Sequence, residues 1–194
     1  MRRTIKLRTG FLLAILSSLS TPAIAYRASE AAQPANVPGS GQNDFDWEIG
    51  SWTTQVRVLR NPLSGEKANW AEYEGTSVVR PLLDGRANFV ELAVAGPSGK
   101  IEGGALRLYN PQTRQWNINY ASLGNGLLTA PIYGGFDSDG RGTFHGQDMI
   151  DGRAIIVRFI ITRVSDREAR FEQAYSADGG ASWENNWIAI DTRR

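Results

Sequence analysis

From Trp52 to the end of the chain, short β-prone runs alternate with turn residues, and this pattern constrains the fold more than any other feature. The runs are rich in Val, Ile, Thr and aromatic residues, which favour strands, and clusters of Gly, Pro, Asn, Asp and Ser separate them about every 10–14 residues. No long stretch shows the 3.6-residue period of an amphipathic helix. The chain is therefore predicted to be all-β.

The pattern predicts ten strands joined by short connections. They are residues 52–60, 69–80, 86–95, 104–109, 115–122, 127–136, 142–150, 153–163, 170–175 and 183–191. Without a crossover helix, such a chain favours a single antiparallel up-and-down β-barrel. Closure would also leave no exposed edge on these apolar strands. A β-sandwich is the alternative fold.

The residues before the first strand, 44–52, predict a short helix that plugs one end of the barrel. Asp44 is placed to cap the first N–H groups of this helix, and Gly50 is placed to end it. Phe45, Ile49 and Trp52 follow at spacings of four and three, so that one helical face is apolar. We expect this face to cover the open barrel end.

Gly50-Ser51-Trp52 resembles the Gly-x-Trp signature with which lipocalins and other calycins enter their first strand after a short helix. In those families the Trp is structural, and an Arg from late in the chain lies over it. Arg193 is the candidate here. Residues 44–193 also resemble a family of small secreted bacterial lipocalin-like domains of unknown function. The resemblance implies a lipocalin-like barrel with Trp47 and Trp52 as structural core residues, and it implies no activity.

The first 25 residues read as an export signal. Four basic residues precede an apolar run from Phe11 to Leu19, and Ala23-Ile24-Ala25 is a cleavage site. The run is too short for a permanent membrane span, which needs about 20 residues. We therefore expect cleavage after Ala25, a flexible linker over residues 26–43, a barrel over residues 44–194, and a periplasmic or secreted protein. Arg2-Arg3 leaves a twin-arginine signal as an alternative to ordinary secretion.

Removing this signal changes the charge of the chain. The full sequence has 21 basic residues, of which 17 remain, against 20 acidic residues, so the mature net charge is near −3. No basic cluster remains to follow a phosphate backbone, and we expect no nucleic-acid partner. The chain has no Cys, which excludes a lipid-anchored lipoprotein and leaves stability to packing.

Three motifs suggest chemistry but are interpreted as structural. Residues 176–183 fit the Asp-box of propellers once, without repeats, so Asp178 and Trp183 are expected to support a hairpin. Asp137-x-Asp139-Gly140 is interpreted as a turn, because the later acidic ligand of a calcium loop is missing. His145 is the only histidine, and no His/Cys cluster exists for zinc or copper. We expect no metal and no cofactor; a haem bound through His145 is the alternative.

The remaining candidates are polar and aromatic side chains on strands that can face inward. Arg158 lies between Ile156 and Ile160, opposite to the apolar face of residues 155, 157, 159 and 161, and either face can point into the barrel. An inward Arg would need an anionic or hydrogen-bonding partner. The candidate ligand-binding residues are Glu91, Arg107, Tyr109, Trp116, Arg158, Gln173 and Trp187.

Three hypotheses for function follow. The first is a barrel that binds a small, partly apolar molecule in its interior, with Arg158 or Arg107 meeting a polar or anionic end. The second is an isomerase, cyclase or hydrolase in which Glu91, Tyr109 or Asp148 performs acid–base chemistry. The third is an interaction module whose interior is filled by its own side chains. The sequence specifies neither the ligand nor the oligomeric state.

Overall fold

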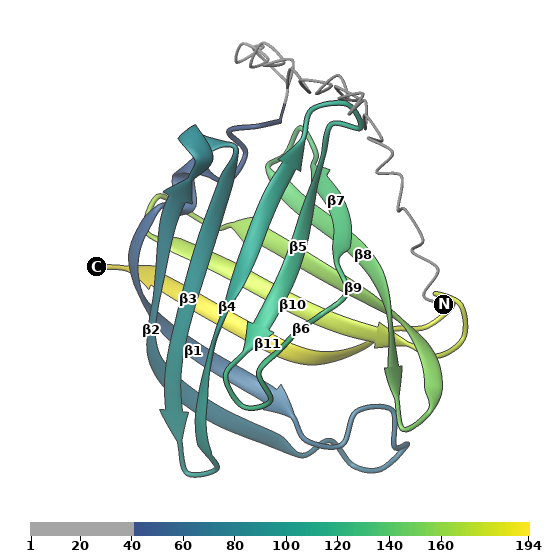
Figure 1. The fold of residues 1–194 in the computed structure, drawn as a ribbon. Coiled ribbons are helices and arrows are strands. Elements are labelled where there is room, and N and C mark those ends of the chain that lie inside the picture. Colours follow the sequence, from purple (N-terminus) through teal and green to yellow (C-terminus); the bar gives the residue numbers. More distant parts are fainter. Residues whose placement is uncertain (1–40) are drawn as a thin grey trace, which may run out of the picture. The chain divides into compact units, whose positions relative to one another are not determined.

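The computed structural model describes residues 41–194, which form a closed antiparallel β-barrel with almost no helix (Figure 1). In chain order the elements are the 3-10 helix η1 (Asp46–Glu48), β1 (Gly50–Leu59), β2 (Trp70–Leu82), the 3-10 helix η2 (Leu83–Gly85), β3 (Ala87–Gly96), β4 (Gly99–Asn110), β5 (Gln115–Ser122), β6 (Leu127–Leu128), β7 (Ile132–Phe136), β8 (Arg141–Ile150), β9 (Arg153–Arg163), β10 (Glu168–Ser176) and β11 (Glu184–Arg193). Within these residues, no helix is long and apolar enough to cross a membrane.

Ten of these strands form the wall, each paired with its neighbours in the chain. The ring closes where β1 pairs with β11, with Trp52 opposite Arg193. The two-residue strand β6 pairs only with β5, and β7 takes the next place in the ring. The prediction of an all-β up-and-down barrel of about ten strands is confirmed, and the sandwich alternative is wrong.

Two predicted strands differ from those observed by a break or by more than two residues, and the others agree within two residues at each end. The strand predicted at 127–136 is broken into β6 and β7 by residues 129–131, where Pro131 has no N–H to donate to a ladder. β4 begins at Gly99 rather than 104, and its glycines lie inside the strand. A Cβ at Gly103 would meet the Ala121 carbonyl oxygen at 2.4 Å, so Gly103 permits a close approach of β5 rather than a turn.

Strand alternation decides which side chains face the interior. In β1, Trp52, Thr54 and Val56 are buried while the residues between them are exposed. In β9, Ile155, Val157 and Ile161 are buried on the inward face. This period of two is the one expected for a strand with one face on the core.

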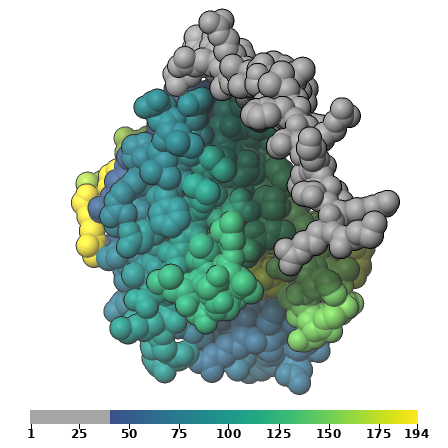
Figure 2. All heavy atoms as spheres, viewed as in Figure 1, coloured from purple at the N-terminus to yellow at the C-terminus, as the bar shows by residue number. Residues whose placement is uncertain are grey.

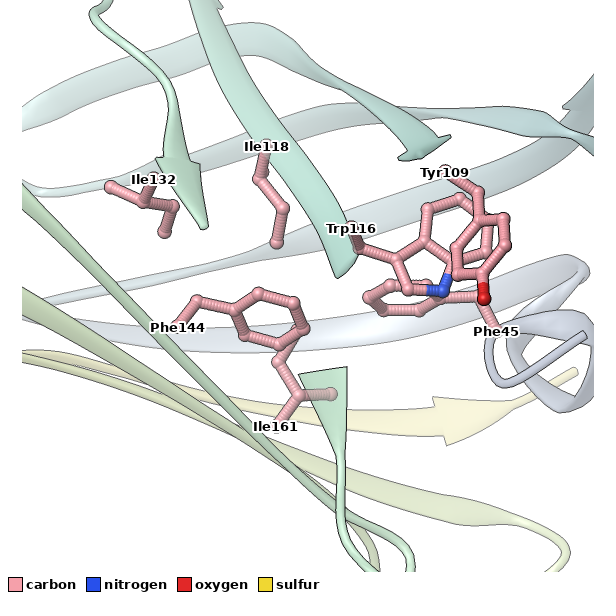
Figure 3. Close-up of a cluster of buried hydrophobic side chains, with 7 residues drawn as sticks. All are labelled: Phe45, Tyr109, Trp116, Ile118, Ile132, Phe144 and Ile161. Carbon is pink, nitrogen blue, oxygen red and sulfur yellow. The ribbon is translucent and has the colours of Figure 1, made fainter. Parts of the chain in front are cut away.

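A cluster of aromatic residues fills the interior beside η1 (Figure 3). Phe45 meets Trp116 and Phe136 edge-on, each with ring centroids 4.9 Å apart, and lies 6.0 Å from the ring of Phe144. Tyr109 packs on Trp116 from the other side. Edge-to-face pairs of this kind add to the stabilisation that burial itself provides.

The segment that leads into β1 is less helical than predicted. Its only helix is η1, which has three residues, and Phe45 rather than Asp44 occupies the N-cap position without a side-chain cap hydrogen bond. The predicted capping by Asp44 is therefore wrong. The pKa of the Asp44 carboxyl is raised by burial and by the neighbouring Asp46, which gives no sign of stabilisation by a helix end.

The apolar residues of the segment are buried or partly buried, but in two clusters rather than on the one helical face that the sequence predicts. Phe45 enters the aromatic cluster, while Ile49 and Trp47 pack against Trp52 in a separate cluster with Val79. Gly41, at the end of the predicted linker, accepts a hydrogen bond from Trp116 Nε1 at 2.9 Å. Whether residues 44–49 act as a plug for the barrel end stays a prediction. The predicted signal peptide and residues 26–40 of the linker lie outside the described residues.

Arg193 lies over the Trp52 ring, with the guanidinium carbon 4.2 Å from the centroid. Its Nη1 donates to the Ile49 carbonyl at 3.0 Å, and its Nη2 donates to the Trp47 carbonyl. Gly50 has φ +131°, and a Cβ there would come within 2.9 Å of Arg193 Nη1. The glycine of Gly-x-Trp therefore leaves room for the arginine that lies over the tryptophan.

The two turn motifs are held by local hydrogen bonds. Asp178 accepts hydrogen bonds from the hydroxyls of Ser176 and Ser182 and from the Ser182 N–H. The bonds from Ser182, the largest contributions, hold the pKa of Asp178 well below its usual range. Asp137 likewise accepts from the N–H groups of Asp139 and Arg141. Both carboxylates stabilise turns, as their sequences predict.

Candidate ligand-binding cavity

The barrel encloses a cavity of about 360 Å³. Most of its lining is apolar, and Val56, Val90, Leu92, Ile118, Ile132, Val157, Phe159, Ile161, Phe171 and Trp187 contribute to it. A smaller polar set consists of Glu48, Thr54, Ser77, Arg107, Tyr120, Thr129, Gln147, Asp148, Arg170, Gln173, Tyr175 and Asp191. An apolar wall with a few polar groups is the usual composition of a small-molecule site.

A buried ion pair lies on the side of the cavity next to η1. Arg107 of β4 reaches Glu48 of η1 with both terminal nitrogens, Nη1 to Oε2 at 2.6 Å and Nη2 to Oε1 at 3.2 Å. Its guanidinium also lies 4.2 Å from the centroid of the Phe45 ring. Both side chains of the pair are almost fully buried, at 5% and 12% exposure. The two charges are thus matched to each other by a bidentate contact.

Asp191 of β11 lies near this pair. Its Oδ1 accepts hydrogen bonds from the hydroxyls of Thr54 on β1 and Ser77 on β2, the latter at 3.2 Å. Burial raises the pKa of the Asp191 carboxyl to about 6, and the Glu48 carboxylate acts in the same direction. The hydroxyl hydrogen bonds and Arg107 lower it, but they do not offset the loss of water.

We call Glu48, Thr54, Ser77, Arg107 and Asp191 the polar floor of the cavity. It carries two carboxyl groups and one guanidinium.

A second polar group lies on β10 and β11. Gln173 Nε2 donates to the Tyr175 hydroxyl at 2.9 Å and to Asn186 Oδ1 at 3.3 Å. The pairing register of β10 with β11 shifts between Gln173 and Ala174. This shift changes which β11 residues face β10. Burial is the main cause of the raised pKa of Tyr175, and the nearby charge of Asp148 adds to it.

The cavity has a lateral mouth where two strands separate. β8 continues to Ile150, but β7 pairs with it only as far as Tyr133 and His145, so residues 146–150 pair with β9 alone. Residues 127–129 stay hydrogen-bonded to β5. Exposed residues on both sides of this gap, Thr129, Ala130, Gln147 and Asp148, line the cavity. In Figure 2, atoms from late in the chain are visible between the β6 segment and the β8–β9 turn.

Three of the seven predicted ligand-binding residues line the cavity: Arg107, Gln173 and Trp187. Two others face inward but belong to the aromatic cluster: Trp116 is 1% exposed and Tyr109 is 8% exposed. They pack against Phe45 and each other instead of against the open space, so their predicted role in the cavity is not supported by their position.

Glu91 and Arg158 lie on the outer face, and the prediction that they face the interior is wrong. Glu91 forms an exposed ion pair with Arg80 on the neighbouring strand, at 2.7 Å. The guanidinium of Arg158 lies 4.2 Å from the centroid of the Trp183 ring, outside the barrel. The inward register of β9 is the apolar one, because residues 155, 157 and 161 are buried there and line up with the inward residues of β10.

His145 is exposed and lies near Trp183, away from the cavity lining.

The sequence interpretation missed the polar floor except for Arg107. Asp191 had an available signal: it follows Trp187 at a spacing of four, so both side chains lie on one face of β11. Thr54 had a similar signal, two residues after Trp52 in β1. The sequence contains no signal for Glu48, because this residue lies in η1 and its partner Arg107 is far away in the sequence.

The solved structures that are similar to this chain include the following three. The S-type phycobiliprotein lyase CPES from Guillardia theta is 13% identical over 77% of this chain and 90% of its own, with a TM-score of 0.53. EF1p2_mFAP2b bound to DFHBI is 13% identical over 79% of this chain and 99% of its own, with a TM-score of 0.43. A de novo designed fluorescence-activating β-barrel is 12% identical over 78% of this chain and 98% of its own, with a TM-score of 0.41.

At these identities the likeness to the lyase shows a lipocalin-like barrel fold and nothing further. No protein-family model matches the chain. No curated protein matches it either.

Proposed function

We propose that this barrel binds a small, partly apolar molecule in its interior and releases it unchanged. The observation that carries the proposal is the cavity of about 360 Å³, which is apolar along most of its wall and polar at its floor. Binding pockets for small molecules occupy roughly 300–1,000 Å³, so this one suits a compact ligand. An interaction module with a filled interior would leave no such space.

Native mass spectrometry of protein purified from its own host tests the proposal most directly. A co-purifying small molecule, released by denaturation, supports it. The bound ligand is then titrated back while tryptophan emission is recorded. Trp187 is the tryptophan that lines the cavity among the described residues. We therefore expect the emission change to disappear in Trp187→Phe.

Trp70→Phe is the matched control for this titration. Trp70 lies at the start of β2, outside the cavity lining, with the guanidinium of Arg57 5.1 Å from its ring centroid. Its removal should leave the ligand-dependent emission change intact. Equal loss of the signal in both variants, or no response of the wild-type protein to any extracted or added apolar molecule, would contradict binding in the cavity.

We also propose that the protein acts in the periplasm or outside the cell, with its mature chain starting at Tyr26. The support is the sequence: a basic start, a short apolar run and the Ala23-Ile24-Ala25 site. Export with a cleaved signal predicts that the N-terminal sequence of the protein from the cell exterior or periplasm begins at Tyr26. Exported material that still begins at Met1 would overturn this proposal.

An acid–base enzyme is the second candidate, and Asp191 is the observation that favours it. A cavity carboxyl whose pKa is raised to about 6 can exchange a proton near neutral pH. Of the residues first considered for this role, Glu91 lies outside and Tyr109 is packed in the aromatic cluster, while Asp148 lies at the mouth. Chemical conversion of the co-purified ligand by the wild-type protein, lost in Asp191→Asn, would favour the enzyme over the binder.

A further inference from the structure

The polar floor leaves one carboxylate oxygen open to the cavity. Asp191 Oδ1 accepts from Thr54 and Ser77, but Oδ2 has no donor among residues 41–194. Within this range, Oδ2 is not one of the polar atoms that are both buried and unpartnered. The atom is therefore accessible. Because Asp191 lines the cavity, this free oxygen faces the space that a ligand would occupy.

The arginine of the floor cannot serve an incoming anion in the same way. Both terminal nitrogens of Arg107 are bound to the two oxygens of Glu48. Its remaining nitrogen, Nε, is sealed by surrounding atoms although it has no partner. An anionic ligand would therefore have to displace Glu48, leaving a second buried carboxylate without a counter-charge. The expectation of an anionic ligand end loses its support.

The charges of the floor point to the opposite kind of ligand. The guanidinium of Arg107 is paired with the carboxylate of Glu48. The charge of Asp191 therefore has no separate counter-charge within the floor. The other ionisable groups that line the cavity are Asp148 at the mouth, the phenols Tyr120 and Tyr175, and Arg170. Arg170 donates to Glu172, 3.0 Å away on the same strand. A hydrogen-bond donor, and most of all a protonated amine, is what the free oxygen of Asp191 lacks.

We propose that the ligand of this cavity has a compact apolar body and an amine or other hydrogen-bond-donating end, which binds Asp191 Oδ2. This rests on the proposed binding function and names the ligand class. The apolar body lies against the Val, Ile, Leu and Phe side chains of the wall. The donor end lies against the polar floor, which is next to η1, away from the lateral mouth.

Three ligands with one apolar body test this proposal: 4-phenylbutylamine, 4-phenylbutan-1-ol and 4-phenylbutanoic acid. Their dissociation constants are measured by calorimetry at pH 8, where Asp191 is ionised. We expect the amine to bind at least tenfold more tightly than the acid, with the alcohol between them. A charge-assisted hydrogen bond accounts for roughly tenfold to hundredfold in affinity.

Variants assign the preference to Asp191. Asp191→Asn should weaken amine binding at least tenfold and change alcohol binding by less than about threefold. At pH 5, where Asp191 is protonated, amine binding to the wild-type protein should weaken by a similar factor, and this pH dependence should vanish in the variant. No histidine lines the cavity within residues 41–194, and Asp148→Asn controls for the other carboxylate at the mouth.

The outcomes separate this proposal from the one it rests on. If none of the three molecules binds and host extracts yield no ligand, both proposals fail. If the acid binds best, or if Asp191→Asn binds the amine as well as the wild-type protein does, the cavity binds ligands but the donor class is wrong. If Asp148→Asn alone removes the preference, the amine is held at the mouth and the assignment to the floor is overturned.

Discussion

Replacing Asp191 by Asn should change the pH dependence of folding stability in a direction that the structure determines. Burial raises the pKa of this carboxyl from 3.8 to about 6. The folded protein therefore binds a proton more tightly than the unfolded chain does. The resulting stabilisation is fully present below pH 3.8 and is lost as the pH rises through 6. The loss is about 3 kcal/mol, because a shift of one pKa unit corresponds to about 1.4 kcal/mol.

Asn at this position cannot ionise, but its carbonyl oxygen can still accept from Thr54 and Ser77. The free energy of unfolding of the variant, minus that of the wild-type protein, should therefore rise by about 2 kcal/mol between pH 4 and pH 8, because the unfolded carboxyl is already partly ionised at pH 4. Urea unfolding at one-unit intervals measures this difference, because groups that titrate equally in both proteins cancel. A difference in the free energy of unfolding that is the same at every pH does not test the prediction.

A difference for Asp191→Asn that stays flat with pH would refute the argument. It would mean that Arg107 or cavity water compensates the Asp191 charge in the folded state, and the case for a donor ligand would lose its electrostatic basis.

Two further predictions concern the entry into β1. Trp52→Ala removes a side chain that is 1% exposed and lies beneath Arg193, so we expect a loss of about 3–5 kcal/mol in the free energy of unfolding; an unchanged melting midpoint would count against a stabilising plug at this barrel end. Gly50→Ala should cost about 1–3 kcal/mol, since it strains a φ of +131° and crowds Arg193. Gly65→Ala, at φ +74° with open space around it, is the control and should cost less in the same urea titration.

The barrel could be predicted because its signals are local and repeated. Two-residue alternation and turn chemistry mark each strand independently, and a chain of such strands with short connections has few ways to pair. β5 and β9 accordingly have the predicted bounds. The position of Arg193 over Trp52 could be anticipated only from the Gly-x-Trp resemblance, since these residues meet through the closing pair of β1 and β11.

The cavity could be predicted only in part, because its polar floor depends on contacts between distant segments. Glu48 and Arg107 are 59 residues apart, and Thr54 and Asp191 are 137 residues apart. Alternation relates residues within one strand, so it placed Gln173 and Trp187 correctly once the face was chosen. Alternation could not show that Glu48 would pair with Arg107. This pairing reverses the charge that we expect at the polar end of the ligand.

The error at Arg158 has a specific cause in β9. This strand is apolar on both faces, with Ile156 and Ile160 flanking Arg158 on one face and residues 155, 157, 159 and 161 on the other. A one-residue shift exchanges the two faces without any penalty visible in the strand itself. The inward face is instead the one that pairs with the inward residues of β10, where Val157 lies opposite Tyr175 and Ile161 lies opposite Phe171.

Trp183 packs on the outer face of β9 at Arg158. Its ring lies 4.2 Å from the Arg158 guanidinium carbon and 6.0 Å from the His145 ring, so three elements meet outside the barrel. A guanidinium over an indole is favourable by about 0.5–1 kcal/mol at an exposed site, without any anionic partner. The arginine that the sequence offered as a ligand anchor therefore lies on an indole outside the cavity, and its buried Nε has no hydrogen-bond partner within residues 41–194. The carboxyl that the sequence left unnoticed, Asp191, is a cavity group with one oxygen that accepts no hydrogen bond from residues 41–194.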